Sequence, residues 1–367
     1  MRRADRLQVE KGRGAVSNPG GRFEATQLTT VDDGWGSLDE PPRRPETLLQ
    51  PDHPRRAITT NDSPDVPFNR SLNPYQGCEH GCIYCFARPT HAYWNLGAGL
   101  DFETRLFYKP ALPELLEREL SAPGYRCETI NLGANTDPYQ PAEREHRISR
   151  RLLEVLLAHR HPVTIVTKGA LIRRDLDLLA ELASRQLVAV FVSLTTLDAG
   201  LKRLLEPRAA SPQARLGAIR ALTDVGVPVG VLLAPTIPAL TDHEMEALLE
   251  AAAGAGAASA GFLLLRLPYE VAQLFEEWLR VHFPDRAERV LNRIREMRGG
   301  KLNDPRFGHR MRGAGPYAGM LAARFEAGCR RYGLATRRKW VLDTSQFVGD
   351  LARPAQGELF ARDASLT

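Results

Sequence analysis

The sequence predicts an α/β protein: a partial (β/α)6 barrel with parallel strands, an irregular N-terminal extension and a basic C-terminal segment. Two observations carry this prediction. Short runs rich in Val, Leu and Ile alternate with longer amphipathic runs of helical period. The short runs are apolar throughout, as expected for strands that are buried on both faces of a parallel sheet.

The expected elements follow one another in βα order. Five strands are predicted at residues 128–134, 162–168, 187–194, 227–234 and 261–267, and a shorter strand leads into a cysteine-rich loop. Helices are predicted at residues 149–160, 174–185, 211–226 and 241–253. About six βα units are fewer than the eight of a closed barrel, so an open barrel is expected. A doubly wound open sheet is the structural alternative.

The regions on either side of these units differ from them in composition. Residues 1–67 are rich in Pro, Gly and charge and have no sustained periodicity, so they form the irregular extension. Residues 68–280 form the barrel core, and residues 281–367 form the basic segment. Polar residues, Gly and Pro gather after each predicted strand, where parallel βα folds place their chemistry.

The basic segment offers a candidate surface for nucleic acid. Residues 280–340 hold 16 basic and 5 acidic side chains. Arginine outnumbers lysine there, and aromatic residues are interleaved: Phe307, Tyr317, Tyr332 and Trp340. Arginine and aromatic side chains are suited to phosphate pairing and base stacking. The alternative is a solvated helical face whose arginines pair with the acidic middle of the chain.

Composition predicts a soluble cytoplasmic protein with no membrane partner. No apolar run reaches the roughly 18 residues of a spanning helix, and the basic N-terminus lacks the apolar run of a secretory signal. The chain has five cysteines, three of them clustered, which argues against a disulfide framework and for a reducing compartment.

The cysteine cluster, Cys78, Cys82 and Cys85 in "CEHGCIYC", indicates a metal centre. With His80 or His91 as fourth ligand, the three thiolates would form a tetrahedral zinc site, although structural zinc sites usually combine two ligand pairs and no second pair follows. A [4Fe-4S] cluster normally takes four thiolates. Three thiolates leave one iron open, and an open iron can bind a substrate. A zinc-stabilised nucleic-acid-binding protein is the alternative function.

The spacing Cys-x₃-Cys-x₂-Cys, with Tyr84 before the third cysteine, resembles the motif of the radical S-adenosylmethionine (SAM) superfamily. The resemblance covers roughly residues 68–300, and "ANTDPYQ", "TKG", "SLTTLD" and "LEPRAASPQARL" are similar to an uncharacterised branch near spore photoproduct lyase. It implies a [4Fe-4S] cluster whose open iron binds SAM, and a reductant such as flavodoxin or ferredoxin. Reductive cleavage of SAM then gives a 5′-deoxyadenosyl radical that abstracts hydrogen from an unidentified substrate.

The resemblance also implies SAM contacts at the loop and strand ends: Tyr84, Asn135, Thr136, Asp137, Lys168, Ser193, Glu206, Arg208 and Ala234. Tyr84 and the backbone of Ala234 would lie near the adenine, and Lys168 would pair with the SAM carboxylate. Ser193 would hydrogen-bond SAM.

The other assignments in this set are broader. One or more of Asn135, Thr136 and Asp137 would bind the amino end of SAM, or the three would form an Asx-turn before Pro138. Glu206 and Arg208 would reach the ribose or carboxylate, or would pair with each other.

The chain departs from spore photoproduct lyase at one position that matters. That family carries a cysteine after the second strand that returns a hydrogen atom to the product, whereas this chain has none in "NLGANTDPYQPAE". The remaining cysteines, Cys127 and Cys329, are expected to be buried small hydrophobic residues. Lyase activity on thymine photodimers is therefore not expected, and no catalytic residue is assigned.

Overall fold

The computed structural model describes residues 7, 9–23, 46–336 and 340–349. In this part of the chain the main sheet has seven strands in the order β10-β9-β8-β7-β6-β3-β2. In chain order these strands are β2 (Thr59–Thr60), β3 (Arg70–Leu72), β6 (Ile130–Leu132), β7 (Val163–Thr167), β8 (Val188–Ser193), β9 (Val229–Thr236) and β10 (Ser259–Leu264).

The strand order identifies the sheet as a partial barrel. The strands from β3 to β10 pair in parallel and in chain order, and only β2 is antiparallel to its neighbour. A doubly wound sheet reverses its strand order at a switch point, and no reversal occurs between β3 and β10 in the described residues. The predicted fold class is confirmed, and the doubly wound alternative is wrong.

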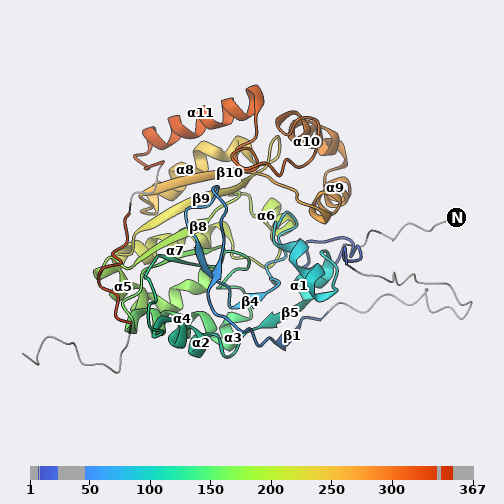
Figure 1. Cartoon of the computed structure of the whole chain (residues 1–367). Helices are drawn as coiled ribbons and strands as arrows, with labels where there is room; N and C mark the ends of the chain where they lie inside the picture. The colour runs from blue at the N-terminus through green and yellow to red at the C-terminus, as the bar shows by residue number, and fades with distance from the viewer. Residues whose placement is uncertain (1–6, 8, 24–45, 337–339, 350–367) are drawn as a thin grey trace, which may run out of the picture.

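Helices cover the outside of this sheet (Figure 1). Helices α2, α4, α5, α7, α8 and α11 pack against one another in that order. The α-helices are α1 (Leu100–Thr104), α2 (Leu112–Leu120), α3 (Glu143–His146), α4 (Ile148–Ala158), α5 (Leu176–Ser184), α6 (Ala199–Leu205), α7 (Pro212–Asp224), α8 (Met245–Gly254), α9 (Glu270–His282), α10 (Pro284–Met297) and α11 (Gly315–Arg331). Short 3₁₀ helices are η1 (Arg88–Trp94), η2 (Ala170–Asp175) and η3 (Asp242–Glu244).

Local sequence explains where these helices begin. The Ser211 hydroxyl accepts a hydrogen bond from the Ala214 N–H, and Pro212 occupies the first turn of α7. The Asp198 carboxylate accepts from two N–H groups at the start of α6. Because α6 and α7 follow β8, these caps place the connecting segment at the carboxyl end of the sheet.

Two hydrophobic cores hold the molecule together. The larger core lies between the sheet and the helices that cover it, and aliphatic side chains of β6 to β9 fill much of it. The second core joins the cysteine loop to α6, α9 and α10, and contains Val16, Ile83, Leu205, Leu265 and Trp278. The cysteine loop is thus built into a packed core, which fixes its position relative to the strand ends.

The N-terminal extension is mostly irregular within the described residues, as predicted, but it contributes two short strands. One is β2, and the other is β1 (Leu48–Pro51), which pairs in parallel with β5 (Arg105–Tyr108). Strand β4 (Tyr75–Gln76) pairs with β5 from the other side, just before the cysteine loop. None of the helices in the described residues has the length and apolar character needed to cross a bilayer.

Candidate functional site

Three thiols gather in the loop that follows β4. Tight turns shape this loop, because the Gly81 N–H donates to the Cys78 carbonyl at 3.4 Å and the Cys85 N–H donates to the Cys82 carbonyl at 3.1 Å. Gly77 and Gly81 adopt φ of 76° and 66°, a backbone conformation that favours glycine. Cys78 and Cys82 are buried, Cys85 is half-buried, and all three are free thiols.

The surroundings of these thiols disfavour a free thiolate. Burial, and then the charge of Asp137, raises the pKa of Cys78, and burial also raises the pKa of Cys82 and of Cys85. The thiols lie near enough for the charges of Cys82 and Cys85 to act on the pKa of Cys78. Bound iron would supply the positive charge that stabilises clustered buried thiolates. Three free thiols in one loop supply the donor atoms of a three-thiolate iron–sulfur cluster.

The two histidines of the zinc alternative have other partners. His80 Nδ1 lies 3.3 Å from the Asp137 carboxylate, and His91 Nε2 lies 2.9 Å from the Arg105 carbonyl oxygen. In the described part of the chain, no three His, Cys, Asp or Glu side chains, Cys78, Cys82 and Cys85 included, gather around one point as the ligands of a single metal ion would. The geometry gives the zinc alternative no support.

Tyr84 leads from the cysteine loop into a buried polar network. Its hydroxyl donates to the Glu206 carboxylate, which also accepts a hydrogen bond from Thr195 at 2.7 Å and pairs with Arg215. The Arg215 guanidinium also donates to the Ser193 carbonyl at 3.0 Å. These residues are all buried. The network therefore joins the cysteine loop to the end of β8 and to α7.

The neighbours of Glu206 stabilise the negative charge of its carboxylate. Burial alone would raise the pKa of this carboxyl, but the positive charges of Arg215 and Lys168 lower it to about 2. Hydrogen bonds from Arg215 and Tyr84 act in the same direction. Glu206 is thus an ionised carboxylate in the protein interior, because a charged partner compensates it there.

Lys168 extends over this network from the end of β7. Its Nζ donates to the Ala234 carbonyl at 3.1 Å and lies 5.9 Å from the centre of the Tyr84 ring. Its positive charge acts on the pKa of Cys82 and of Cys85. The side chain is half-buried. A cation beside the cysteine loop can bind the carboxylate of a ligand that approaches the three thiols.

The Asp137 carboxylate has several hydrogen-bond partners within the protein. Its carboxylate accepts hydrogen bonds from the Lys168 N–H at 2.6 Å, the Thr167 hydroxyl at 2.7 Å and the Tyr139 N–H at 2.9 Å. The last of these bonds is the Asx-turn that the sequence offered as an alternative. Burial opposes ionisation, but His80 and the hydrogen bonds from Lys168 and Thr167 lower the pKa of Asp137 to about 2. The side chain ties β7 to the cysteine loop.

Thr136 and Asn135 occupy different environments. The Thr136 hydroxyl donates to the Gly77 carbonyl at 2.8 Å and accepts from the Gln140 amide at 3.1 Å. Gln140 in turn accepts a hydrogen bond from the Glu79 N–H at 2.9 Å. Thr136 therefore braces the loop around Cys78. The Asn135 N–H donates to the Asn73 side chain at 2.7 Å, and the Asn135 side chain is half-buried with no hydrogen bond in the described residues.

The alternative prediction that Glu206 and Arg208 pair with each other is wrong. Arg208 lies 2.9 Å from the Glu79 carboxylate, whereas Glu206 pairs with Arg215. The sequence analysis missed Arg215, because a single arginine within a helical pattern looks like a surface residue. Thr195 and Gln140 were missed for a similar reason, since nothing in their spacing shows that they meet the cysteine loop.

A second buried ion pair contacts the cysteine loop. Arg88 donates to the Cys82 carbonyl at 2.9 Å and pairs with Glu103, and both side chains are fully buried. The Glu103 carboxylate also accepts from the Gly14 and Ala15 N–H groups at 2.8 and 2.9 Å. A Cβ on Gly14 would lie 1.9 Å from the Gly81 carbonyl oxygen. Residues 9–23 thus form an N-terminal strap that packs on the loop.

The cysteines outside the cluster lie elsewhere. Cys127 precedes β6, at the amino end of the sheet and opposite the strand ends that carry the site. Cys329 belongs to α11 and packs into the larger hydrophobic core. The expectation that Cys329 is a buried small hydrophobic residue is confirmed, whereas Cys127 is only half-buried.

The arginines of the basic segment find several partners. Arg324 pairs with Glu246 of α8 at 2.7 Å, as the alternative of pairing with the acidic middle predicted. Arg306 pairs with Asp304 and Arg293 with Glu296, both within the segment. Residues 337–339, the basic run "RRK", lie outside the described residues.

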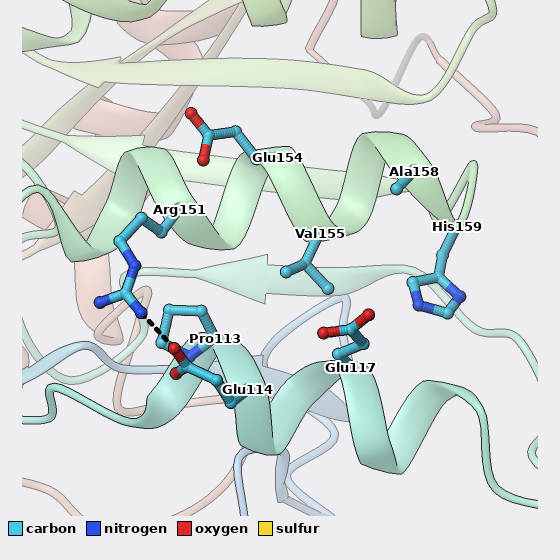
Figure 2. Close-up of a pocket in the computed structure, with 8 residues that line it drawn as sticks. All are labelled: Pro113, Glu114, Glu117, Arg151, Glu154, Val155, Ala158 and His159. Carbon is cyan, nitrogen blue, oxygen red and sulfur yellow. Dashed lines mark hydrogen bonds and ion pairs between the residues drawn. The ribbon is translucent and has the colours of Figure 1, made fainter. Parts of the chain in front are cut away.

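A groove on the outer surface is unrelated to the thiols. It lies between α2 and α4 and has a volume of about 260 Å³ (Figure 2). Glu114, Glu117 and Glu154 line it, and Arg151 pairs with Glu114. Both helices belong to the outer layer, away from the carboxyl ends of the strands. We assign no chemistry to this groove.

Comparisons with other proteins bear on the family. The model of the Radical SAM superfamily matches residues 72–252. An uncharacterised protein of Mycobacterium bovis and one of Mycobacterium tuberculosis are each 39% identical over 250 residues, which is 67% of this chain and 72% of each relative. An uncharacterised protein of Methanocaldococcus jannaschii is 28% identical over 173 residues, 47% of this chain and 62% of that protein.

Solved structures share the fold. Spore photoproduct lyase complexed with dinucleoside spore photoproduct gives a TM-score of 0.57 at 15% identity, over 78% of this chain and 81% of that chain. A variant of that lyase with bound AdoMet and the same dinucleoside gives a TM-score of 0.57 at 16% identity, with the same coverage. At this identity, the similarity shows a common architecture.

Proposed function

The chain belongs to the radical SAM superfamily, and from this premise we propose that it is an enzyme that cleaves SAM reductively and uses the resulting radical to abstract a hydrogen atom from a substrate. The observation that carries the proposal is the set of three free thiols, two of them buried, beside the Lys168 cation and next to the ends of β7 and β8. A [4Fe-4S] cluster bound there would supply the electron that breaks the sulfonium C–S bond of SAM.

The residues of this chain would hold the cluster and orient SAM. We assign Cys78, Cys82 and Cys85 to the cluster and Lys168 to the SAM carboxylate. The hydrogen bond from Lys168 to the Ala234 carbonyl holds the cation near the thiols. This carbonyl also lies 3.3 Å from the Thr195 hydroxyl, so Ala234 stands beside the Tyr84 network, where the adenine contact is proposed.

The amino end of SAM is best assigned to Asn135. Its side-chain amide makes no hydrogen bond in the described residues, and its carbonyl oxygen can accept from an ammonium group. Thr136 and Asp137 would act indirectly, because their side chains already hold the cysteine loop and the Lys168 backbone. We therefore propose that these two residues position the site rather than touch SAM.

Tyr84, Ser193 and Glu206 are proposed to shape the adenosine side. The Glu206 carboxylate fixes the Tyr84 hydroxyl, so that the ring keeps one orientation beside the Lys168 cation. Ser193 ends β8 and is buried. Arg208 is partly exposed and paired with Glu79, so a ribose contact would require it to turn away from that partner.

In this proposal no cysteine after β6 returns a hydrogen atom to the product. The described cysteines outside the cluster lie at the other end of the sheet or in the larger core. A reductant such as flavodoxin or ferredoxin would deliver the electron. We place the reaction in the cytoplasm, since five free thiols suit a reducing compartment.

SAM cleavage without any substrate tests the proposed function. Anaerobically reconstituted protein, reduced with dithionite, is expected to convert SAM slowly to 5′-deoxyadenosine and methionine, because the site holds both the electron source and the SAM contacts. Chromatography of the nucleoside product measures the rate. Absence of 5′-deoxyadenosine from a sample that carries a full cluster would refute the proposal.

Lys168→Ala is expected to weaken SAM binding while the cluster remains. Losing a hydrogen bond to a charged group costs on the order of 1.5–3 kcal/mol, so the KM for SAM should rise by roughly 10- to 100-fold. Iron content and the visible spectrum report the cluster, and initial rates at varied SAM concentration report KM. An unchanged KM would show that Lys168 does not bind SAM.

A further inference from the structure

Arg266 lies at the rim of the barrel and pairs with no carboxylate of the residues that the structure describes. It follows β10 by two positions, and its side chain is half-buried. Its guanidinium lies 5.0 Å from the centre of the Phe86 ring, and Nη1 is 3.6 Å from Met311 Sδ, a weak acceptor. No carboxylate within the described residues forms an ion pair with it.

The neighbours of Arg266 add positive charge. Burial, then Arg310 and Arg298, lowers the pKa of Arg266 to about 10. Arg298 donates to the carbonyl oxygens of His309 and Leu265 and forms no ion pair in the described residues, although the charge of Asp304 acts on its pKa. The charges of Asp65 and Cys85 act on the pKa of Arg266 in the opposite direction, and Asp65 is already paired with Arg310. This corner of the molecule therefore has the electrostatics of an anion site.

Two exposed aromatic rings accompany these arginines. Phe86 is 48% exposed and Phe307 is 56% exposed. The Arg310 guanidinium lies 4.5 Å from the centre of the Phe307 ring, as Arg266 lies over Phe86. An exposed ring beside an arginine offers a stacking platform next to a phosphate ligand, a combination that recurs in proteins that bind single-stranded nucleic acid.

A hollow lies beside these residues, and Arg266 meets it through Met311, one of its lining residues. The hollow has a volume of about 320 Å³ and is lined by Pro64, Asp65, Gly308, Met311 and Arg312. Arg312 is exposed on its edge. Phe86 directly follows the cluster ligand Cys85. A chain bound along Arg312, Arg266 and Phe86 would therefore reach the thiols from the strand ends, where the substrate has to meet SAM.

We propose that Phe86, Arg266, Phe307, Arg310 and Arg312 form a surface that binds single-stranded nucleic acid, with phosphates at the arginines and bases stacked on the two rings. This inference rests on the proposed function, because it names single-stranded nucleic acid as the substrate class of the proposed radical SAM site. Phe307, Arg310 and Arg312 belong to the segment 280–340 that the sequence offered for nucleic acid, and Phe86 and Arg266 extend that surface to the rim beside Cys85.

Binding of a fluorescein-labelled oligothymidylate, followed by anisotropy over a range of salt concentrations, tests the surface. The reconstituted full chain is expected to bind it, with an affinity that falls as salt rises. Arg266→Gln and Arg312→Gln should each weaken binding and flatten the slope of log K against log salt by about 0.7, the value for one lost contact to a single strand. An oligouridylate probe distinguishes RNA from DNA.

The aromatic platform gives a different signature. Phe86→Ala should weaken binding at least about fivefold through lost stacking, yet leave the salt slope unchanged. Arg280→Gln is the matched control, because Arg280 lies on α9 and is paired with Glu276 and Glu288 away from the hollow. It should bind the probe as the unaltered protein does.

Three results would overturn the proposal: no binding of either probe at low salt, an equal loss in Arg280→Gln and Arg266→Gln, or equal competition by a polyglutamate peptide. Equal competition by polyglutamate would show that the surface binds any polyanion and does not recognise nucleic acid. SAM cleavage by the unaltered protein is measured in parallel. If it persists while the probes fail to bind, the surface is refuted and the proposed function stands. If it is absent from a sample that carries a full cluster, the proposed function is refuted.

Discussion

Cys82→Ala is expected to abolish the iron–sulfur cluster. Anaerobically reconstituted protein should hold about four irons per chain, the content of one [4Fe-4S] cluster, and the variant close to none. Cys82 is the middle of the three thiols and is buried in the second core. Two remaining thiolates cannot hold a cubane in the geometry that three provide. Iron analysis and absorbance near 400 nm, which is a property of such clusters, measure the effect.

Cys127→Ala is the matched control for this experiment. Cys127 is a free, half-buried thiol that precedes β6, at the end of the sheet opposite the cysteine loop. Its replacement should leave the iron content and SAM cleavage unaltered. If Cys82→Ala retained four irons, the assignment of the cluster to these three cysteines would be wrong. Loss of iron in both variants would point to a general failure of reconstitution.

Glu206→Gln is expected to cause the second large effect, a loss of folding stability. Glu206 is fully buried and compensates the buried charge of Arg215, while it also accepts hydrogen bonds from Tyr84 and Thr195. Removing one partner of a buried ion pair leaves the other charge uncompensated and typically costs about 3–5 kcal/mol. Urea unfolding of the variant and the parent protein, both without cluster, measures the difference in the free energy of unfolding.

The effect should depend on pH in a definite direction. The pKa of Glu206 is lowered to about 2 in the folded protein from an ordinary value of 4.5. A carboxyl whose pKa is lowered by folding stabilises the protein above its unfolded pKa, and this stabilisation is lost as pH falls toward the folded pKa. The difference between parent and variant should therefore be full above about pH 4.5 and shrink toward pH 2.

Glu276→Gln provides a control on the surface. Glu276 pairs with Arg280 on α9, and the arginine side chain is 50% exposed. Exposed pairs contribute about 0–1 kcal/mol, so this variant should unfold almost as the parent does. Equal stability losses in the two variants would show that the Glu206 network contributes no more than a surface ion pair.

The sequence predicted the elements of the fold well, because both strand burial and helix amphipathicity leave a local pattern. The strand expected at residues 187–194 is β8 (Val188–Ser193), and the helix expected at residues 211–226 is α7 (Pro212–Asp224). The small sheet of β1, β4 and β5 was not predicted, since strands of two to four residues are too short to show a period.

The candidate site was predicted in part. The motif placed the three cysteines and Tyr84 in one loop, and the strand ends placed Lys168, Ser193 and Ala234 at one edge of the sheet. The roles of Asp137 and Glu206 could not be predicted in this way. Their partners are distant in sequence, since Glu206 meets Tyr84 and Arg215, and Asp137 meets His80.

The sequence by itself determined the spacing of three thiols in one loop and the order of the βα units, because both are written in neighbouring residues. Only the tertiary structure decided what surrounds that loop. It brought the Gly14 and Ala15 N–H groups to the Glu103 carboxylate, Arg215 to Glu206, and Arg266 to Phe86. The physical reason is that a buried charge or an anion site depends on groups from separate segments, which only packing of the whole chain can bring together.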